Sequence, residues 1–225
     1  MRNDLVNDEF VNAARDFAYL MNQHYPRKTI LKIVGDRYLL NAFQRILLSR
    51  GIFKEEDIQL RIHKTINKID SRAICIDAYN VFFTISNYLL GRIVFFSNDR
   101  FLRDAGEVYG KLHKEPVFSR AIDLTMNFLK KAGPSSVEFQ LDKPISHSAE
   151  LAGKLRALLE AALIPGDAQI DKNPDAVLIR KSTGIIATSD SDILDETELP
   201  IVDLAQLVLA DNFILELPDL GKLLS

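Results

Sequence analysis

The sequence predicts an α/β protein in which a mostly parallel sheet, with helices on both faces, follows a small all-helical N-terminal module. Three observations predict this class. Residues 1–70 place apolar side chains at helical spacing, residues 71–225 alternate short apolar runs with helical segments, and several short runs end on an aspartate. Strand–helix alternation favours parallel pairing, because a crossover helix carries the chain back across the sheet. We therefore predict two domains, 1–70 and 71–225.

The helices expected in the N-terminal module cover residues 10–21, 27–34 and 41–50. Pro26 suits the first turn of the second helix, and Gly51 suits the end of the third. From Ile58 to Ile69 apolar and polar residues alternate, which indicates a strand leading to a linker near Asp70.

In the second domain the same patterns predict strands alternating with helices. The predicted strands are 73–77, 92–97, 136–141, 168–170, 184–188 and 201–202. The predicted helices are 81–90, 101–113, 118–131, 146–163 and 204–209, with a further helix starting at 173–175.

The composition is that of an ordinary soluble globular protein. The 225 residues are 47% hydrophobic and 26% charged, enough for one α/β domain and a smaller appendage. No uncharged apolar run reaches the roughly 18 residues of a membrane helix, and the chain does not start like a signal peptide. We therefore expect a cytoplasmic protein without a membrane partner.

The net charge of −3 conceals an uneven distribution of charge. Residues 15–54 contain eight bases and two acids, whereas residues 185–225 contain nine acids and one base. Such a split favours a surface that binds polyanions, although a solvated helical face explains the bases equally well. The basic residues predicted to bind substrate are Arg27, Lys28, Lys32, Arg37 and Arg45. If they do not bind substrate, the module is expected to form a homodimer or dock a partner.

Three apolar runs end on acids, at Asp77, Asp142 and Asp190. In a parallel sheet these strand ends share one edge, where α/β proteins bind ligands. Like charges gathered there oppose folding unless a cation is present, and carboxylates suit Mg²⁺ or Mn²⁺, which drive phosphodiester hydrolysis. The alternative for Asp77 is that it only caps the following helix.

Several neighbouring residues extend this candidate site. Asp104, one turn inside the predicted helix 101–113, and Asp192 are the second-tier metal ligands. Asn80 is expected to position water or substrate, or else to bond the backbone of its own turn. Lys143 and Ser146 are expected to bind phosphate at a helix start, although Ser146 is equally an ordinary N-cap. Asp175 is as readily a helix-dipole acid as a ligand.

Other kinds of site fit the sequence poorly. It lacks the glycine-rich motif of a dinucleotide site and the P-loop motif, and Ser189 does not lie in a nucleophile elbow. An aspartyl-phosphate phosphatase normally has a second aspartate two residues after the first, where this chain has Tyr79. A structural zinc site is disfavoured because the chain has one cysteine, Cys75, and four scattered histidines.

Two motifs carry a family resemblance. Residues 76–81, Ile-Asp-Ala-Tyr-Asn-Val, resemble the Asp-Gly-Tyr-Asn-Val opening of the NYN group of PIN-like nucleases, and residues 187–192 resemble its late Thr-x-Asp-x-Asp motif. The segments Tyr-Pro-Arg-Lys and Val-Gly-Asp-Arg-Tyr, at 25–28 and 34–38, are similar to the helical module of an uncharacterised, mainly archaeal family with a PIN-like domain behind it.

The resemblance implies a metal-dependent ribonuclease that acts on RNA, with Asp77, Asp142 and Asp190 at motif positions. The sequence departs from the pattern at Ala78, where glycine is usual. The middle acid of this group usually lies in a helix, which leaves three rival candidates: Asp99, Asp104 and Glu107. The alternative is a non-catalytic nucleic-acid-binding or protein-interaction module that retains the fold.

Overall fold

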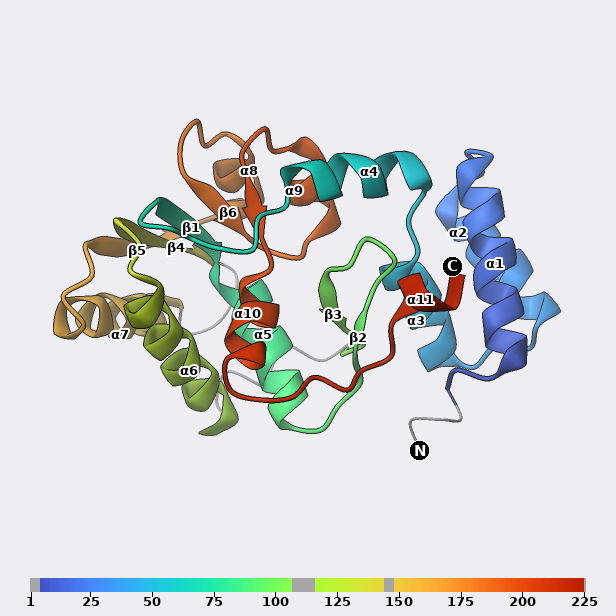
Figure 1. Cartoon of the computed structure of the whole chain (residues 1–225), viewed down its shortest axis with the longest axis horizontal. Helices are drawn as coiled ribbons and strands as arrows, with labels where there is room; N and C mark the ends of the chain where they lie inside the picture. The colour runs from blue at the N-terminus through green and yellow to red at the C-terminus, as the bar shows by residue number, and fades with distance from the viewer. Residues whose placement is uncertain (1–4, 107–115, 144–147, 225) are drawn as a thin grey trace. The chain divides into compact units, whose positions relative to one another are not determined.

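The computed structural model describes residues 5–106, 116–143 and 148–224, drawn in colour in Figure 1. These residues form two compact units. The first contains the described residues up to His63 together with 92–105 and 216–224, and the second contains 64–91 and the remaining described residues between 106 and 215. Within the described ranges, no helix combines the length and the apolar character needed to cross a membrane.

The first unit is mainly helical, as the N-terminal pattern predicted. Its helices are α1 (Asp8–Asn22), α2 (Arg27–Arg37), α3 (Ala42–Gly51), α4 (Glu55–Lys64, with its last residue in the second unit) and the short α11 (Leu220–Leu224). Helix α1 begins where the Asn7 side chain accepts a hydrogen bond from the Phe10 amide at 2.9 Å, and it buries Phe10 and Phe17. Residues 35–37 continue α2 beyond its predicted end.

The strand predicted from Ile58 is wrong, because residues 55–64 form helix α4. The alternation of apolar residues misled the prediction: α4 buries Ile58 and Arg61, one helical turn apart, and leaves Leu60 58% exposed. Three acids, Glu55, Glu56 and Asp57, lie in the first turn, where negative charge stabilises a helix. That acidic start was the overlooked helix signal.

The helix predicted for residues 101–113 is also wrong in its described part. Strand β3 (Leu102–Asp104) pairs antiparallel with β2 (Val94–Phe96), so that Phe95 faces Arg103. Pairing with β2 overrides the local pattern, because it satisfies backbone groups that a helix start would leave open. Asp104 therefore lies on a strand, and residues 107–113 fall outside the described ranges.

The second unit contains a five-stranded parallel sheet in the described residues, in the order β5-β4-β1-β6-β7. The strands are β1 (Ala73–Asp77), β4 (Ser136–Asp142), β5 (Gly166–Asp171), β6 (Ile185–Ala187) and β7 (Ile201–Val202). Numbered along the chain within this sheet, the order is 3-2-1-4-5. This is a doubly wound order, with its switch point between β1 and β6.

Helices cover both faces of this sheet, as predicted (Figure 1). Helices α5 (Ala78–Leu89), α6 (Pro116–Ala132) and α7 (Ser148–Ala161) follow β1 and β4, and Phe82 of α5 contacts Phe139 of β4 with ring centroids 5.9 Å apart. Helices α8 (Pro174–Ile179) and α9 (Ser191–Glu196) lie together on the other face, where α8 contacts β1, β4 and β5. Helix α10 (Leu204–Ala210) packs on α5 and α6.

Candidate active site

The carboxyl edge of the sheet gathers polar residues from neighbouring strands. Asp77, Asp142 and Asp171 are the last residues of β1, β4 and β5, and Asp190 follows β6 by three residues. Parallel pairing therefore brings the predicted Asp77, Asp142 and Asp190 to one edge. Asp77 and Asp190 flank the switch point, which is the place where doubly wound sheets bind ligands.

Hydrogen bonds link the two sides of the switch point. The Thr188 hydroxyl donates to Asp77 Oδ2 at 2.9 Å and accepts from the Asp190 amide at 3.1 Å. Asp77 also caps α5, accepting a weak hydrogen bond from the Asn80 amide at 3.4 Å. The alternative of a helix cap was thus correct for Asp77, but the Thr188 contact shows that its carboxylate also belongs to the edge of β6.

Asn80 is held by the loop after β6. Its Oδ1 accepts hydrogen bonds from the Ser189 amide at 2.9 Å and from the Ser189 hydroxyl at 3.0 Å. Because a backbone N–H can only donate, the Asn80 atom facing it is the carbonyl oxygen. The amide nitrogen of Asn80 is therefore the group that remains to donate to a ligand at this half-buried position.

The acids of this edge act on one another electrostatically. Burial raises the pKa of Asp77 to about 7, against the hydrogen bond from Thr188. The charges of Asp190 and Asp175 raise it further. Strongly perturbed pKa values cluster at functional sites, so Asp77 is a candidate site residue.

Asp175 is the residue whose importance the sequence left open. It lies in the first turn of α8, directly after Pro174. Burial, followed by the charge of Asp175, raises the pKa of Asp142, and burial followed by Asp190 and Asp192 raises that of Asp175 itself. Asp175 therefore interacts with acids on both sides of β1. Its position after a strand, beside a helix-starting Asn-Pro pair, was the available signal.

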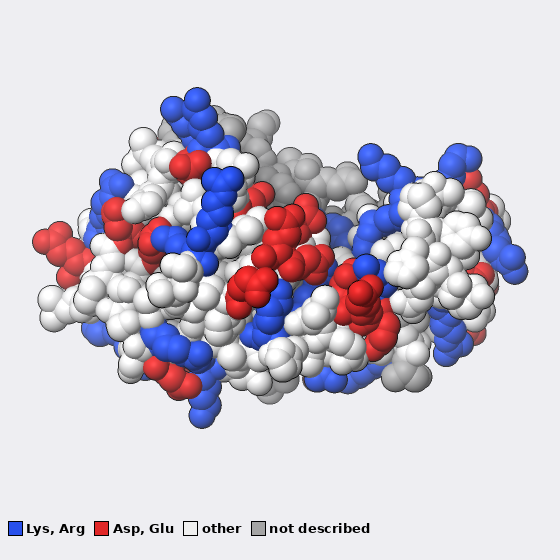
Figure 2. Space-filling model, turned by 90° about the horizontal axis from the view of Figure 1, so that it is seen from above, with Lys and Arg blue, Asp and Glu red and all other residues white. Residues whose placement is uncertain are grey.

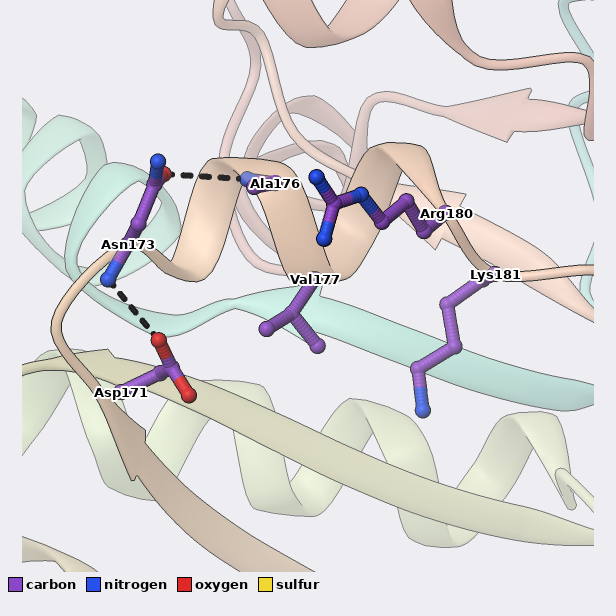
Figure 3. Close-up of a pocket in the computed structure, with 6 residues that line it drawn as sticks. All are labelled: Asp171, Asn173, Ala176, Val177, Arg180 and Lys181. Carbon is purple, nitrogen blue, oxygen red and sulfur yellow. Dashed lines mark hydrogen bonds between the residues drawn. The ribbon is translucent and has the colours of Figure 1, made fainter.

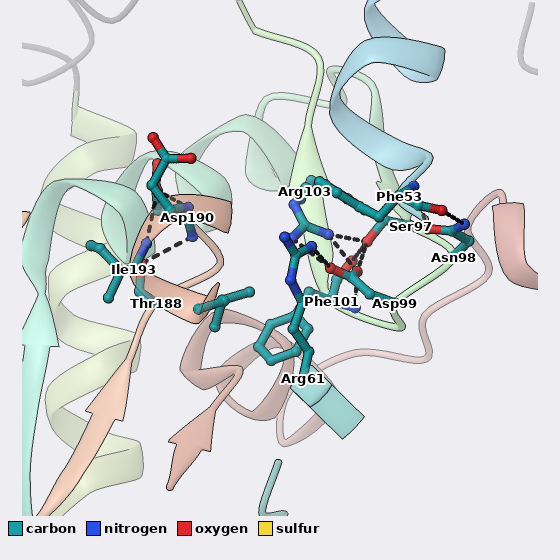
Figure 4. A network of polar contacts seen from close by, with 12 residues as sticks. Phe53, Arg61, Ser97, Asn98, Asp99, Phe101, Arg103, Thr188, Asp190 and Ile193 are labelled. Carbon is teal, nitrogen blue, oxygen red and sulfur yellow. Dashed lines mark hydrogen bonds and ion pairs between the residues drawn. The ribbon is translucent and has the colours of Figure 1, made fainter. Parts of the chain in front are cut away.

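Asp190 has a structural role that its motif did not reveal. Its Oδ1 accepts hydrogen bonds from the Asp192 amide at 2.9 Å and the Ile193 amide at 3.5 Å and so caps α9. Figure 4 shows the contact with Ile193 and the separate hydrogen bond from the Asp190 amide to Thr188. The cap engages Oδ1, and among the described residues Asp190 Oδ2 accepts no hydrogen bond. Asp192 lies in the first turn of the same helix.

Within the described residues, no group of three Asp, Glu, His or Cys side chains stands close enough to hold a metal ion. The fit to Mg²⁺ therefore rests on donor chemistry. Carboxylates that raise one another's pKa make a site that a cation stabilises, and Mg²⁺ is commonly held by one or two carboxylates plus waters and substrate phosphates. The edge residues fit such an open site, with the remaining ligands supplied by water and substrate.

Two acids proposed from the sequence as the middle acid are engaged in ion pairs in the first unit. Asp104 is buried in β3 and lies 3.8 Å from Arg50. Asp99 is bound by Arg61 and Arg103, each at 2.6 Å (Figure 4). Glu107 lies outside the described residues. The placement of Asp104 inside a helix was wrong, so a helical position does not favour it over Asp99.

Most cations of the N-terminal module have partners within the first unit. Arg27 donates to the Ser49 carbonyl, and its guanidinium lies 4.9 Å from the Phe53 ring centre. The other ion pairs are Lys32–Asp36, Arg37–Asp16 and Arg45–Asp36, at 3.7, 3.9 and 2.9 Å. Lys28 is exposed, without an ion pair to any described residue. Among the side chains coloured in Figure 2, bases are interspersed with acids on the face shown. Substrate binding by these residues stays a prediction.

The remaining predicted phosphate ligands are only partly described. Lys143 is exposed directly after Asp142, and its amide donates to the Asp171 carbonyl at 2.8 Å. Ser146 lies outside the described residues. Helix α7 begins at Ser148, whose hydroxyl donates a hydrogen bond to the Asp142 carbonyl at 2.6 Å.

Fold and edge together define an α/β protein with a doubly wound parallel sheet and an acidic switch point. The chain belongs to the family described as "Domain of unknown function (DUF5616)", whose model matches residues 66–207. A second model, "Protein of unknown function (DUF434)", matches residues 9–64. The chain is similar to "Uncharacterized protein MJ0935" of Methanocaldococcus jannaschii, with 31% identity over 195 residues that cover 85% of this chain and 92% of that protein. No solved structure matches the chain.

Proposed function

We propose that this protein is a divalent-metal-dependent ribonuclease of the PIN-like, NYN type, acting at the acidic edge around Asp77. The observation that carries the proposal is that Asp77, Asp142, Asp175 and Asp190 lie along the carboxyl edge of the sheet and interact electrostatically. Three of these acids, Asp77, Asp142 and Asp175, have raised pKa values. Burial is the main cause and the charges of neighbouring acids add to it; both disfavour the ionised carboxylates, so their presence at a ligand-binding edge favours a cation as the resident partner.

The proposed metal ligands are Asp77, Asp142 and Asp190, with Asp175 added by its position and Asp192 as an outer residue. A bound Mg²⁺ or Mn²⁺ supplies activation of water and neutralisation of the scissile phosphate. The hydrogen bond from the Thr188 hydroxyl orients the Asp77 carboxylate, and the Asp190 amide holds that hydroxyl in place by donating to it. The two loops that carry the acids are thereby held in register without the ion.

Asn80 contributes a hydrogen-bond donor to this proposed reaction. Ser189 holds the Asn80 oxygen through two contacts, so the amide nitrogen is directed away from that loop. A fixed donor next to Asp77 suits a phosphate oxygen of the substrate, whose negative charge the neighbouring carboxylates repel. Asn80 is accordingly a substrate-positioning residue rather than a metal ligand.

A second candidate function is a nucleic-acid-binding module without catalysis. It is favoured by the absence, within the described residues, of three side chains close enough to form a ready metal site. In that case the raised pKa of Asp77 is a consequence of burial and of the neighbouring acids alone, and RNA is bound but not cleaved whether or not metal ions are added.

One experiment separates the two candidates. Purified protein is stripped of metal with a chelator and incubated with a labelled single-stranded RNA, with and without added Mg²⁺ or Mn²⁺. We expect cleavage only with metal, and a loss of about a hundredfold or more in Asp77→Asn, since such electrostatic stabilisation is worth that much. Asp123→Asn, an exposed acid on α6, is the matched control and should cleave normally. Equal cleavage by all three proteins would identify a contaminating nuclease and remove the proposal.

A further inference from the structure

A polar hollow lies beside the acidic edge, between the end of β5 and helix α8. Its volume is about 540 Å³, and Figure 3 shows its lining: Asp171, Asn173, Ala176, Val177, Arg180 and Lys181. Small-molecule sites of proteins typically measure about 300–1,000 Å³. The hollow therefore has the size to receive one nucleotide.

Most charged and polar groups of this lining are already engaged. Lys181 Nζ donates to both carboxylate oxygens of Glu138, at 2.6 and 2.7 Å. Asp171 Oδ1 accepts from the Asn173 amide at 2.9 Å, and the Asn173 side-chain oxygen caps α8 at the Ala176 amide. These contacts fix the walls of the hollow and neutralise the charge of Lys181.

Arg180 differs from the rest of the lining. It is exposed and forms no ion pair with a described carboxylate, and its side chain lies back along α8 with the guanidinium toward Ala176 (Figure 3). A guanidinium offers two parallel N–H donors that match the oxygens of a phosphate. The structure thus presents an unneutralised cation at the rim of a nucleotide-sized hollow.

Helix α8 connects this cation to the acids. Asp175 lies in its first turn and Arg180 caps its end, which places them five residues and about 7.5 Å apart along the axis. Helix α8 also contacts β1, β4 and β5, so its position relative to the edge is set by packing within the second unit. An RNA strand bound at the edge near Asp175 would therefore pass close to Arg180.

We propose that the hollow along α8 is a substrate subsite, in which Arg180 binds a backbone phosphate of the RNA strand next to the scissile one. This inference rests on the proposed ribonuclease function and adds the source of affinity that an acidic edge lacks. Most predicted cations of the N-terminal module are engaged with acids or carbonyls of their own unit, whereas Arg180 is not.

The test measures RNA binding apart from cleavage. Fluorescence anisotropy follows a labelled single-stranded oligoribonucleotide, with chelator present so that no strand is cut, over a range of salt concentrations. Arg180→Ala should weaken binding about tenfold and reduce the salt slope by about 0.7, the value for one lost phosphate contact on a single strand. Arg180→Lys should recover part of the affinity, because it keeps the charge but not the paired donors.

Arg120→Ala is the matched control, since Arg120 is an exposed arginine on α6, which packs on α5 on the other face of the sheet. It should bind RNA like the wild type. An unchanged salt slope in Arg180→Ala, or equal weakening in both alanine variants, would overturn the subsite. If Arg180→Ala loses affinity while the wild type never cleaves RNA with metal, the subsite stands and the ribonuclease proposal fails.

Discussion

Two buried carboxylates of this protein, Asp99 in the first unit and Asp77 in the second, have opposite surroundings. Asp99 receives guanidinium donors from Arg61 at 2.6 Å and from Arg103 at 2.6 and 2.8 Å. Burial alone raises the pKa of Asp99, but the two guanidinium groups outweigh burial and hold that pKa well below its usual range. At Asp77 a hydroxyl and a backbone amide are the donors, and the pKa rises to about 7.

The difference separates a structural acid from a candidate functional one. Both guanidinium groups that bind Asp99 also stack on the Phe53 ring, at 4.1 and 4.6 Å from its centre, so the network ties α4 to the β2–β3 hairpin. Asp77 has acids as its charged neighbours, Asp190 and Asp175. The buried charge of Asp99 is paired within the chain, whereas the charged neighbours that raise the pKa of Asp77 are acids.

The largest effect is expected from breaking the paired acid. Asp99→Asn leaves two buried guanidinium groups with excess positive charge, and such changes cost about 3–5 kcal/mol. Denaturant unfolding followed by circular dichroism should show this loss, with Asp123→Asn unchanged. A loss of unfolding free energy below about 1 kcal/mol would mean that Arg61 and Arg103 find other partners. Asp99 would then not be a structurally required acid.

The unpaired acid should respond in the opposite direction. The Asp77 carboxyl has an ordinary pKa of 3.8 when unfolded and about 7 when folded, so the folded state keeps its proton to higher pH than the unfolded state does. Stability of the metal-free protein should therefore fall as pH rises from about 4 to 7 and level off above 7. Asp77→Asn, which cannot ionise, should remove this slope and gain about 1–3 kcal/mol at pH 8. A variant that is less stable than the wild type at pH 8 would identify Asp77 as a structural cap.

A smaller effect is expected from adding the ion. If Mg²⁺ binds the folded acidic edge, ten times its Kd adds about 1.4 kcal/mol of stability. For a chain of this size, that corresponds to about 3–6 °C in melting temperature. Asp77→Asn and Asp142→Asn should each reduce this rise in melting temperature. Asp99→Asn should lower the melting temperature without Mg²⁺ but keep the rise when Mg²⁺ is added. Sodium chloride at equal ionic strength is the control. An equal shift in Asp142→Asn would remove that residue from the site.

Local patterns were sufficient for much of the second unit. Strands ending at Asp77 and Asp142 were correctly predicted. The first ends a continuous apolar run, as a strand buried on both faces requires, and the second ends a segment in which apolar and polar residues alternate. Strand and helix alternation also predicted the mostly parallel sheet with helices on both faces. These features depend on neighbours in sequence, which is why the sequence alone determined them.

Tertiary structure decided the features that depend on distant partners. Pairing with β2 made residues 102–104 a strand, and packing of Ile58 and Arg61 made residues 55–64 a helix. The 3-2-1-4-5 order placed β6 next to β1, so that Thr188 contacts Asp77 and Asp175 joins the acids. Ion pairs with Arg61 and Arg103 distinguish the buried Asp99 from the buried Asp77. Each of these outcomes depends on which residues meet in space, and the spacing of one residue type along the chain does not carry that information.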